Sequence, residues 1–417
     1  QYATGIINMV LDPTGQVMIT TSNDNQIRYW GLDGRLLKRF SAEHDYPSLL
    51  AMAPNGRAFV TGSTDITVWA ADGKKLFRGK AHAVGGRDAV FSPDGTMLYT
   101  GGADGYLNII PLTPGRKPLQ VKPHDGKVVA AIAVHPDGQR IATGSIWDRF
   151  RILDLEGKVL ASFEMPKDTR PPFNTVDAMQ FTPDGQSLVV ATTRQDREIG
   201  IYDMNARLQH SIATGNRSSP GALAISPSGR WLATTVNQDV GIWDLKTRER
   251  RSLLRGHRGR VSALAFTRDE RHLISASSDG TMRVWNLQNG QSFALLSDRD
   301  EWVMYTDDGY FDASRRGGDL IALVRGQQTY AIDQIAMRYN RPDLIYERVG
   351  IGEPAFREHF RNHYEERLRR AQMKTAAAET WSAPEVRVVE YRQDKRELNL
   401  TVEASDAREP LRAIQVY

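Results

Sequence analysis

The 417-residue sequence contains no cysteine. Thiolate nucleophiles, cysteine zinc sites, iron–sulfur clusters and disulfides all need that side chain, so none of them can be built within this chain. The sequence also lacks any run of about 18 consecutive apolar residues, the length that a membrane-spanning helix needs. A P-loop, a dinucleotide-binding fingerprint and a nucleophile elbow are missing as well. These absences exclude several common enzyme classes and argue against a membrane partner.

A basic-then-apolar signal segment is not visible either, which favours a cytoplasmic over a periplasmic location. Because the chain starts at Gln1, we expect its native start to be missing. What is present is a globular composition, 40% hydrophobic and 25% charged, with a net charge of +4. This length and composition predict more than one domain. The small basic surplus does not by itself indicate a nucleic-acid partner.

A Pro-x-Gly turn after an apolar run recurs along the first three hundred residues. The turns centre on Pro13, Pro54, Pro93, Pro136, Pro183 and Pro227, with a degenerate seventh at Arg268. Successive separations are 39 to 47 residues. Each turn lies between two predicted strands, and a third strand and a short fourth follow. Seven four-stranded units of about 42 residues predict a mainly β fold, a seven-bladed β-propeller over residues 1–297.

The seventh unit is the most complete copy. It has His257 before its first strand, Ser275 on the second, Asp279 in the next turn and Trp285 at the end of the third strand. These units resemble WD40 repeats, and the resemblance implies that the four side chains form a hydrogen-bonded structural tetrad. A Ser-His-Asp hydrolytic triad is the alternative, but the spacing matches the tetrad. We therefore expect no catalytic residues in this chain.

Other units carry incomplete tetrads. The matching residues are His44, Thr61, Asp65 and Trp69 in unit two, and His82, Thr100 and Asp104 in unit three, where Ile110 replaces the tryptophan. Units five and six lack the histidine, and unit four has Trp147 at the position of the turn aspartate. We expect these blades to depend more on apolar packing.

Beyond the propeller, residues 298–350 predict a hairpin and helices. The hairpin turn at Asp308 is favoured over half of an eighth blade. Pro342 and Pro354 are placed to open two helices. The second helix, within residues 351–382, carries Phe356, Phe360, Tyr364 and Leu368 as an apolar stripe that we expect to pack within the chain. Residues 383–417 predict the truncated start of an immunoglobulin-like β-sandwich.

Residues 301–303, 308–314, 339–344 and 383–387 are similar to bacterial multidomain proteins in which a WD40 propeller precedes a caspase-like (peptidase C14) domain. This resemblance implies a non-catalytic sensing and docking region, whose loops bind a protein or peptide, with a protease domain downstream in the same gene product. No catalytic residue of that family maps onto this chain. The alternative is a free-standing WD40 scaffold that assembles a protein complex without any protease.

Three groups of residues are candidate partner contacts. The first is the basic run Lys246, Arg248, Arg250, Arg251, Arg255, Arg258 and Arg260. It predicts either a surface for an acidic peptide, phosphate or nucleic acid, or an edge strand protected by charge. No aromatic residues interleave with it, which argues against single-stranded nucleic acid. The others are Trp147 with Arg149, and Phe173, in loops that can equally reflect simple variation.

A histidine pair, His359 and His363, has the i, i+4 spacing that can grip one metal ion from a helix face. The general-base glutamate of an H-E-x-x-H site is missing, and a charged surface helix explains the pair without metal. We therefore expect no metal and no cofactor. A propeller enzyme that acts through pocket carboxylates or this pair is the third alternative.

Overall fold

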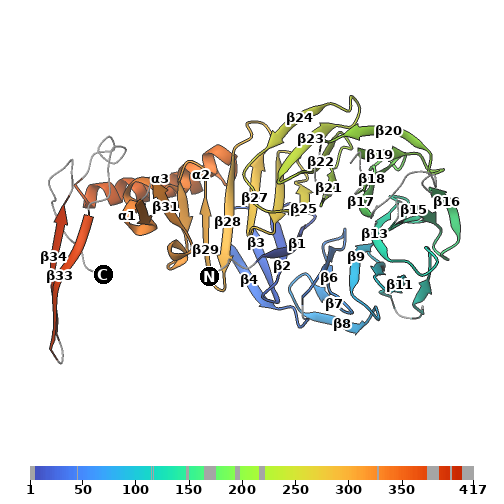
Figure 1. The fold of residues 1–417 in the computed structure, drawn as a ribbon, viewed down its shortest axis with the longest axis horizontal. Helices are drawn as coiled ribbons and strands as arrows, with labels where there is room; N and C mark the ends of the chain where they lie inside the picture. The colour runs from blue at the N-terminus through green and yellow to red at the C-terminus, as the bar shows by residue number, and fades with distance from the viewer. Residues whose placement is uncertain are drawn as a thin grey trace. The chain divides into compact units, whose positions relative to one another are not determined.

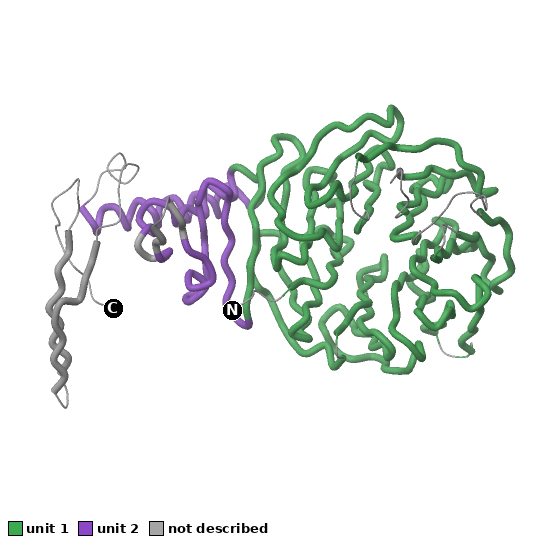
Figure 2. Tube along the Cα trace, in the orientation of Figure 1, with its two compact units in different colours: residues 1–298, 348–351 green, residues 299–347, 352–417 purple. Residues whose placement is uncertain are grey.

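The computed structural model describes residues 5–44, 46–113, 115, 117–146, 150–163, 175–192, 198–215, 221–325, 328–372, 385–394 and 397–405. The chain divides into two compact units (Figure 2). The propeller unit contains Gln1–Asp298 and the short segment Arg348–Ile351. The C-terminal unit contains Arg299–Glu347 and Gly352–Tyr417.

The propeller unit consists of seven blades, each made from four consecutive antiparallel strands (Figure 1). Six of the blades are separate four-stranded sheets, and the strands of the seventh belong to a six-stranded sheet. The predicted seven-bladed, mainly β fold is confirmed. The first four blades are β1 (Ile6–Leu11), β2 (Val17–Ser22), β3 (Gln26–Gly31), β4 (Leu36–Ser41); β5 (Leu49–Met52), β6 (Ala58–Gly62), β7 (Asp65–Ala70), β8 (Lys75–Lys80); β9 (Gly86–Phe91), β10 (Met97–Gly102), β11 (Leu107–Pro111), β12 (Leu119–Val121); and β13 (Val129–Val134), β14 (Ile141–Ser145), β15 (Phe150–Leu153), β16 (Val159–Phe163).

Blades 5 to 7 follow the same order along the chain. They are β17 (Val176–Phe181), β18 (Leu188–Thr192), β19 (Glu198–Tyr202), β20 (Leu208–Ala213); β21 (Leu223–Ile225), β22 (Trp231–Val236), β23 (Asp239–Asp244), β24 (Arg250–Leu254); and β25 (Val261–Phe266), β26 (His272–Ser277), β27 (Thr281–Asn286), β28 (Ser292–Asp298).

The first strand of each blade lines the middle of the ring. These strands contact their neighbours in sequence, and β1 also contacts β25. Among the described residues, the ring therefore closes by packing of blade 1 against blade 7 and not by a shared strand. Apolar residues of adjoining blades fill the interfaces, and the largest fully buried side chains include Trp30, Trp243 and Trp285.

The recurring turn positions the first two strands of each blade. Its glycine adopts a left-handed backbone, with φ 75° at Gly15 and 73° at Gly95, where a side chain would be strained. In the degenerate seventh turn Glu270 takes that conformation, with φ 56°. Its carboxylate accepts hydrogen bonds from the backbone N–H and the hydroxyl of Ser228 in blade 6. A contact between blades thus accompanies the strained backbone.

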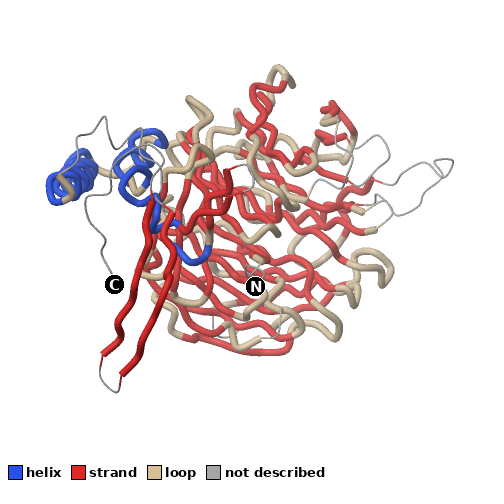
Figure 3. Tube along the Cα trace, turned by 60° about the vertical axis from the view of Figure 1, so that its left-hand side comes forward, coloured by secondary structure: helices blue, strands red, loops and turns tan. Residues whose placement is uncertain are grey.

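The helices, which are blue in Figure 3, belong to the C-terminal unit, except for the last two residues of α2. Its elements are β29 (Glu301–Tyr305), β30 (Phe311–Ala313), the 3-10 helix η1 (Gly317–Leu320), β31 (Ala322–Arg325), β32 (Gln328–Ala331), α1 (Ile332–Tyr339), α2 (Pro342–Val349), α3 (Pro354–Arg370), β33 (Glu385–Asp394) and β34 (Glu397–Ser405). β29 and β30 pair as the predicted antiparallel hairpin. Within the described residues, none of these helices has the length and apolar character needed to cross a membrane.

The apolar stripe of α3 packs within the C-terminal unit. The ring of Tyr346 on α2 lies 5.3 Å from that of Phe356 and 5.8 Å from that of Phe360, centroid to centroid. Tyr364 and Leu368 are buried, with Met337 of α1 against them. The prediction of packing within the chain is confirmed for this stripe.

Among the strands that the structure describes, the last two pair with each other alone. β33 and β34 form a two-stranded antiparallel sheet. The third strand predicted for this region, at residues 414–417, lies outside the described residues. The immunoglobulin-like start therefore stays a prediction.

Candidate interaction surface

Blade 7 contains a continuous chain of polar contacts. Trp285 Nε1 donates to Ser275 Oγ at 2.8 Å, and that oxygen lies 2.7 Å from His257 Nε2. His257 Nδ1 lies 3.2 Å from Asp279 Oδ2. One arrangement satisfies every group: the serine hydroxyl donates to Nε2, and the Nδ1 proton is donated to the carboxylate. The structure therefore brings the four expected tetrad residues together with their polar atoms paired.

Asp279 also fixes the loop that precedes the blade. Its carboxylate accepts from the backbone N–H of Arg258 at 2.8 Å and from the backbone N–H and hydroxyl of Thr281. Burial opposes ionisation, but the hydrogen bonds from His257, Thr281 and Arg258 outweigh it and hold the pKa of Asp279 well below its usual range. A charged, fully bonded carboxylate thus anchors the loop to blade 7.

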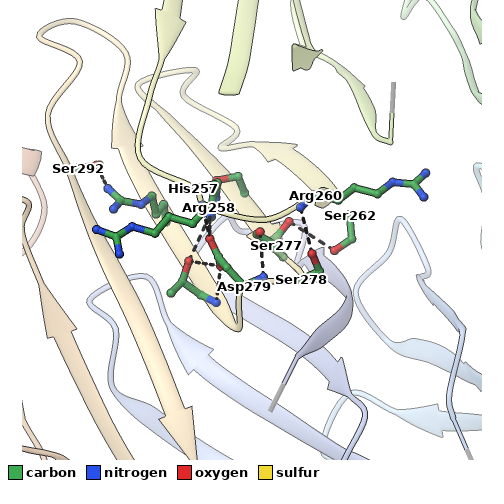
Figure 4. A network of polar contacts seen from close by, with 12 residues as sticks. His257, Arg258, Arg260, Ser262, Ser277, Ser278, Asp279 and Ser292 are labelled. Carbon is green, nitrogen blue, oxygen red and sulfur yellow. Dashed lines mark hydrogen bonds and ion pairs between the residues drawn. The ribbon is translucent and has the colours of Figure 1, made fainter. Parts of the chain in front are cut away.

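The loop at residues 255–260 is held by its backbone and presents its side chains outward. The N–H of Arg260 donates to Ser278 Oγ at 3.0 Å. The side chains of Arg258 and Arg260 are exposed and extend away from the network (Figure 4). Neither has an ion pair with any residue that the structure describes, whereas Arg255 lies 3.6 Å from Asp239. The loop therefore has a fixed backbone and carries two exposed guanidinium groups, those of Arg258 and Arg260, without a counter-charge among the described residues.

The predicted basic run is not one patch. Lys246, Arg248, Arg250 and Arg251 lie in the turn before β24 or at its start, and the other three arginines follow its end. At roughly 3.3 Å per residue, the strand separates the two groups by about 15 Å. The structure therefore divides the run into two basic surfaces, the loop at 255–260 and the outer edge of blade 6.

Blade 3 places its three predicted residues together. His82 Nδ1 lies 3.0 Å from Asp104 Oδ1, and His82 Nε2 lies 3.0 Å from Thr100 Oγ1. The Asn108 amide, two residues before Ile110, donates to the carbonyl of Ala81 at 2.7 Å.

Blade 2 departs from the expected tetrad. Trp69 Nε1 donates to Thr61 Oγ1 at 2.8 Å, but His44 Nε2 lies 2.8 Å from Thr67 Oγ1 instead. Asp65 lies on β7, and its nearest ion-pair partner is Arg78 at 3.5 Å. The expectation that His44 joins Thr61 and Asp65 needs correction here.

The cause is the length of the hairpin between the second and third strands. The tryptophan follows the hydroxyl residue by 10 positions in blade 7 but by 8 in blade 2. Two fewer residues move the aspartate out of the turn and onto the strand.

Sequence reasoning left out one histidine of this kind. His124 is buried, and its Nε2 lies 3.0 Å from Thr143 Oγ1 in blade 4. It precedes the threonine by 19 positions, close to the 18 that separate His257 from Ser275. That spacing is the signal that identifies it.

The remaining candidates divide into described and undescribed residues. Trp147, Arg149 and Phe173 lie outside the described residues. His359 and His363 are exposed on α3, with ring centroids 4.4 Å apart. Within the part of the chain that the structure describes, no group of three or more His, Cys, Asp or Glu side chains is arranged to hold a metal ion.

Comparison with known proteins agrees with this architecture. The model "WD domain, G-beta repeat" matches residues 73–110, 116–152 and 248–286. The WD repeat-containing protein SL1-17 of Schistosoma mansoni is 25% identical over 201 residues, 48% of this chain and 51% of that protein. The tRNA (guanine-N(7)-)-methyltransferase non-catalytic subunit wuho of Anopheles gambiae is 23% identical over 272 residues, 63% of this chain and 69% of that protein. The matched region is about half the length of the first relative.

Proposed function

We propose that this chain, which carries WD40 repeats in a seven-bladed propeller, is a non-catalytic scaffold. It binds an acidic segment of a partner protein at the loop of residues 255–260. One observation carries the proposal. The backbone of this loop is hydrogen-bonded to Asp279 and Ser278, while the guanidinium groups of Arg258 and Arg260 are exposed and have no ion pair within the described residues.

The chemistry of the arginine side chain supports an acidic partner. Arginine presents a planar fork of donors that matches a carboxylate, and it is enriched at the centres of protein interfaces. A loop already fixed by its backbone loses little conformational freedom on binding, so more of the contact energy remains as affinity. Complementary charge also speeds association, and salt weakens that effect.

The relatives support the scaffold rather than an enzyme. One is named as a WD repeat-containing protein and the other as a non-catalytic subunit, which is a member of an enzyme assembly. We extend to this chain only the general role of a propeller subunit within a protein assembly.

The test is partner capture by matched variants. Immobilised wild-type protein, R258E/R260E and the control R271E are incubated with a lysate of the native cell, and bound proteins are quantified by mass spectrometry. Arg271 is also an exposed arginine of blade 7, so its reversal changes charge without touching the loop. We expect R258E/R260E to lose acidic partners by about tenfold, and R271E to retain them. Equal capture by all three proteins would refute the proposal.

A second candidate function rests on residues 301–303, 308–314, 339–344 and 383–387, which resemble bacterial caspase-like multidomain proteins. In this form of the proposal the scaffold is the sensing region of a protease, and the C-terminal unit couples partner binding to catalysis. Neither relative's name mentions a protease. The intact mass and peptide sequence of the native gene product test it. A caspase-like segment with paired cysteine and histidine residues would support the protease form, and its absence would leave the scaffold alone.

A further inference from the structure

We propose that the outer edge of blade 6 is a second docking site, which takes an extended acidic peptide as an added strand beside β24. β24 is the last strand in its sheet, so no described strand pairs with its outer edge (Figure 1). An edge strand presents backbone N–H and C=O groups that a further strand can pair. This site lies at the opposite end of β24 from the loop at 255–260 and does not depend on it.

The edge carries cations without counter-charges. Lys246, Arg248, Arg250 and Arg251 are all exposed, and none has a carboxylate within ion-pair distance among the described residues. The outer strand of blade 2 is different, because Lys75 lies 2.7 Å from Glu43 and the Arg78 guanidinium is shared between two carboxylates. In blade 2 these positive charges are neutralised by carboxylates of the chain itself. On blade 6 the positive charges remain available to an external anion.

Aromatic rings, not carboxylates, hold two of these arginines. The Arg251 guanidinium carbon lies 4.6 Å from the centroid of the Trp231 ring, and Trp231 itself packs against the core shared with blade 7. Arg248 Nη1 lies 3.1 Å from His210 Nδ1 on β20. Such contacts restrict the long side chains without cancelling their charge. The cations are thus positioned before an anion arrives, which lowers the entropy cost of binding.

The carboxylate of Asp244, at the end of β23, is already occupied. Asp244 accepts from the backbone N–H groups of Lys246 at 2.9 Å and Thr247 at 3.1 Å, and it lies 3.4 Å from Arg230 Nε. The Thr247 backbone hydrogen bond is the main cause that keeps the pKa of Asp244 below its usual range. Asp244 therefore fixes the turn and does not neutralise Arg250 or Arg251.

One register position distinguishes this edge from two of the other outer strands. Strand register pairs Trp30 with Leu36, Leu153 with Val159 and Trp243 with Arg250, so the residues that follow occupy equivalent positions. Those residues are the exposed Leu37, the exposed Leu160 and, on blade 6, Arg251. Of these three equivalent positions, only the one on β24 carries a positive charge. Pairing of two β24 edges would place like charges together, which disfavours a second copy of the chain.

The test uses a fluorescein-labelled peptide of alternating glutamate and valine, with fluorescence anisotropy as the readout. We expect saturable binding to the full chain, and an affinity about tenfold lower for R250E/R251E. The variant R250Q/R251Q should fall between them. The control K75E lies on the outer strand of blade 2, and it should bind like wild type, as should R258E/R260E. Thermal unfolding of each variant confirms that it is folded.

A second peptide, N-methylated at consecutive residues so that both of its edges are blocked, retains its charges but cannot pair as a strand. We expect it to bind at least about tenfold more weakly than the parent peptide. Hydrogen exchange should slow at the β24 amides when the parent peptide is bound. Equal binding of the two peptides would overturn strand addition. The absence of parent binding, or unchanged binding by R250E/R251E, would overturn the site itself without bearing on the loop at 255–260.

Discussion

Blade 7 and blade 2 contain the same kinds of polar residue and use them differently. In blade 7, Asp279 lies in a turn, bonds His257 and holds the backbone of the preceding loop. In blade 2, Asp65 lies on a strand and pairs with Arg78. A hairpin two residues shorter accounts for the difference.

The comparison shows how turn length decides where positive charge is available. When the aspartate stays in the turn, it satisfies backbone groups, and the arginines of the loop remain without counter-charges. When it moves to the strand, it neutralises a cation on the outer edge. Repeats with one residue pattern can therefore leave cations without counter-charges in one blade and pair them within another.

The largest expected effect is the loss of the Asp279 carboxylate. D279A leaves His257, Thr281 and the Arg258 N–H without their partner, and we expect it to lower the free energy of unfolding by about 2–3 kcal/mol. Urea unfolding at pH 7 measures this. Because folding lowers the pKa of Asp279 from its ordinary 3.8, the difference between D279A and wild type should shrink as the pH falls below about 4. A change smaller than that of D65A would contradict the comparison.

An intermediate effect on stability is expected when Asp88 is replaced. Its carboxylate makes a contact between two blades, unlike those of Asp279 and Asp65. It lies on β9 and accepts from the backbone N–H of Ile132 in blade 4 at 2.7 Å. Burial raises the pKa of Asp88 to about 7. The folded state then binds more protons than the unfolded state between pH 4 and 7, so this group's contribution to stability falls as the pH rises through that range.

D88N removes this dependence and keeps a hydrogen-bond acceptor. We expect it to be about 1 kcal/mol more stable than wild type at pH 8 and equal to it near pH 4. Urea unfolding at both pH values measures the difference. A variant that is less stable at pH 8 would show that the charged carboxylate is favoured in the fold.

The smallest effect is expected for D65A. Its ion pair with Arg78 spans 3.5 Å, and both side chains are more than 40% exposed. Such pairs contribute little, so we expect a change of less than about 0.5 kcal/mol in the free energy of unfolding. Urea unfolding beside D279A checks it. A loss above about 1.5 kcal/mol would mean that Asp65 stabilises blade 2 much as Asp279 stabilises blade 7.

The propeller was predictable because its signals are local. Turns such as the one at Pro93 recur at nearly constant spacing, and third strands end on buried residues such as Trp30 and Trp285. The hairpin near Asp308 and the helices at Pro342 and Pro354 follow from equally local turn and helix-start chemistry. Each of these features depends on a few neighbouring residues.

The candidate site was less predictable because it depends on register and on contacts between strands. Two missing residues redirected His44 to Thr67, which matching of residue types does not reveal. The basic run looked continuous because the sequence does not show that β24 separates its halves. The contact between Arg251 and Trp231 joins the first and last of three strands, and no sequence pattern predicts it.

The most direct test of the account is site-specific photocrosslinking of the partner. Photoreactive benzoylphenylalanine is placed at position 255, in the loop before blade 7, or at position 46, in the loop before blade 2. Arg255 and Tyr46 are both exposed, so the two probes are equally accessible. We expect an acidic partner to crosslink at position 255 and not at position 46, and R258E/R260E to abolish the crosslink. Crosslinking at position 46 alone, or crosslinking at 255 that survives the charge reversal, would contradict it.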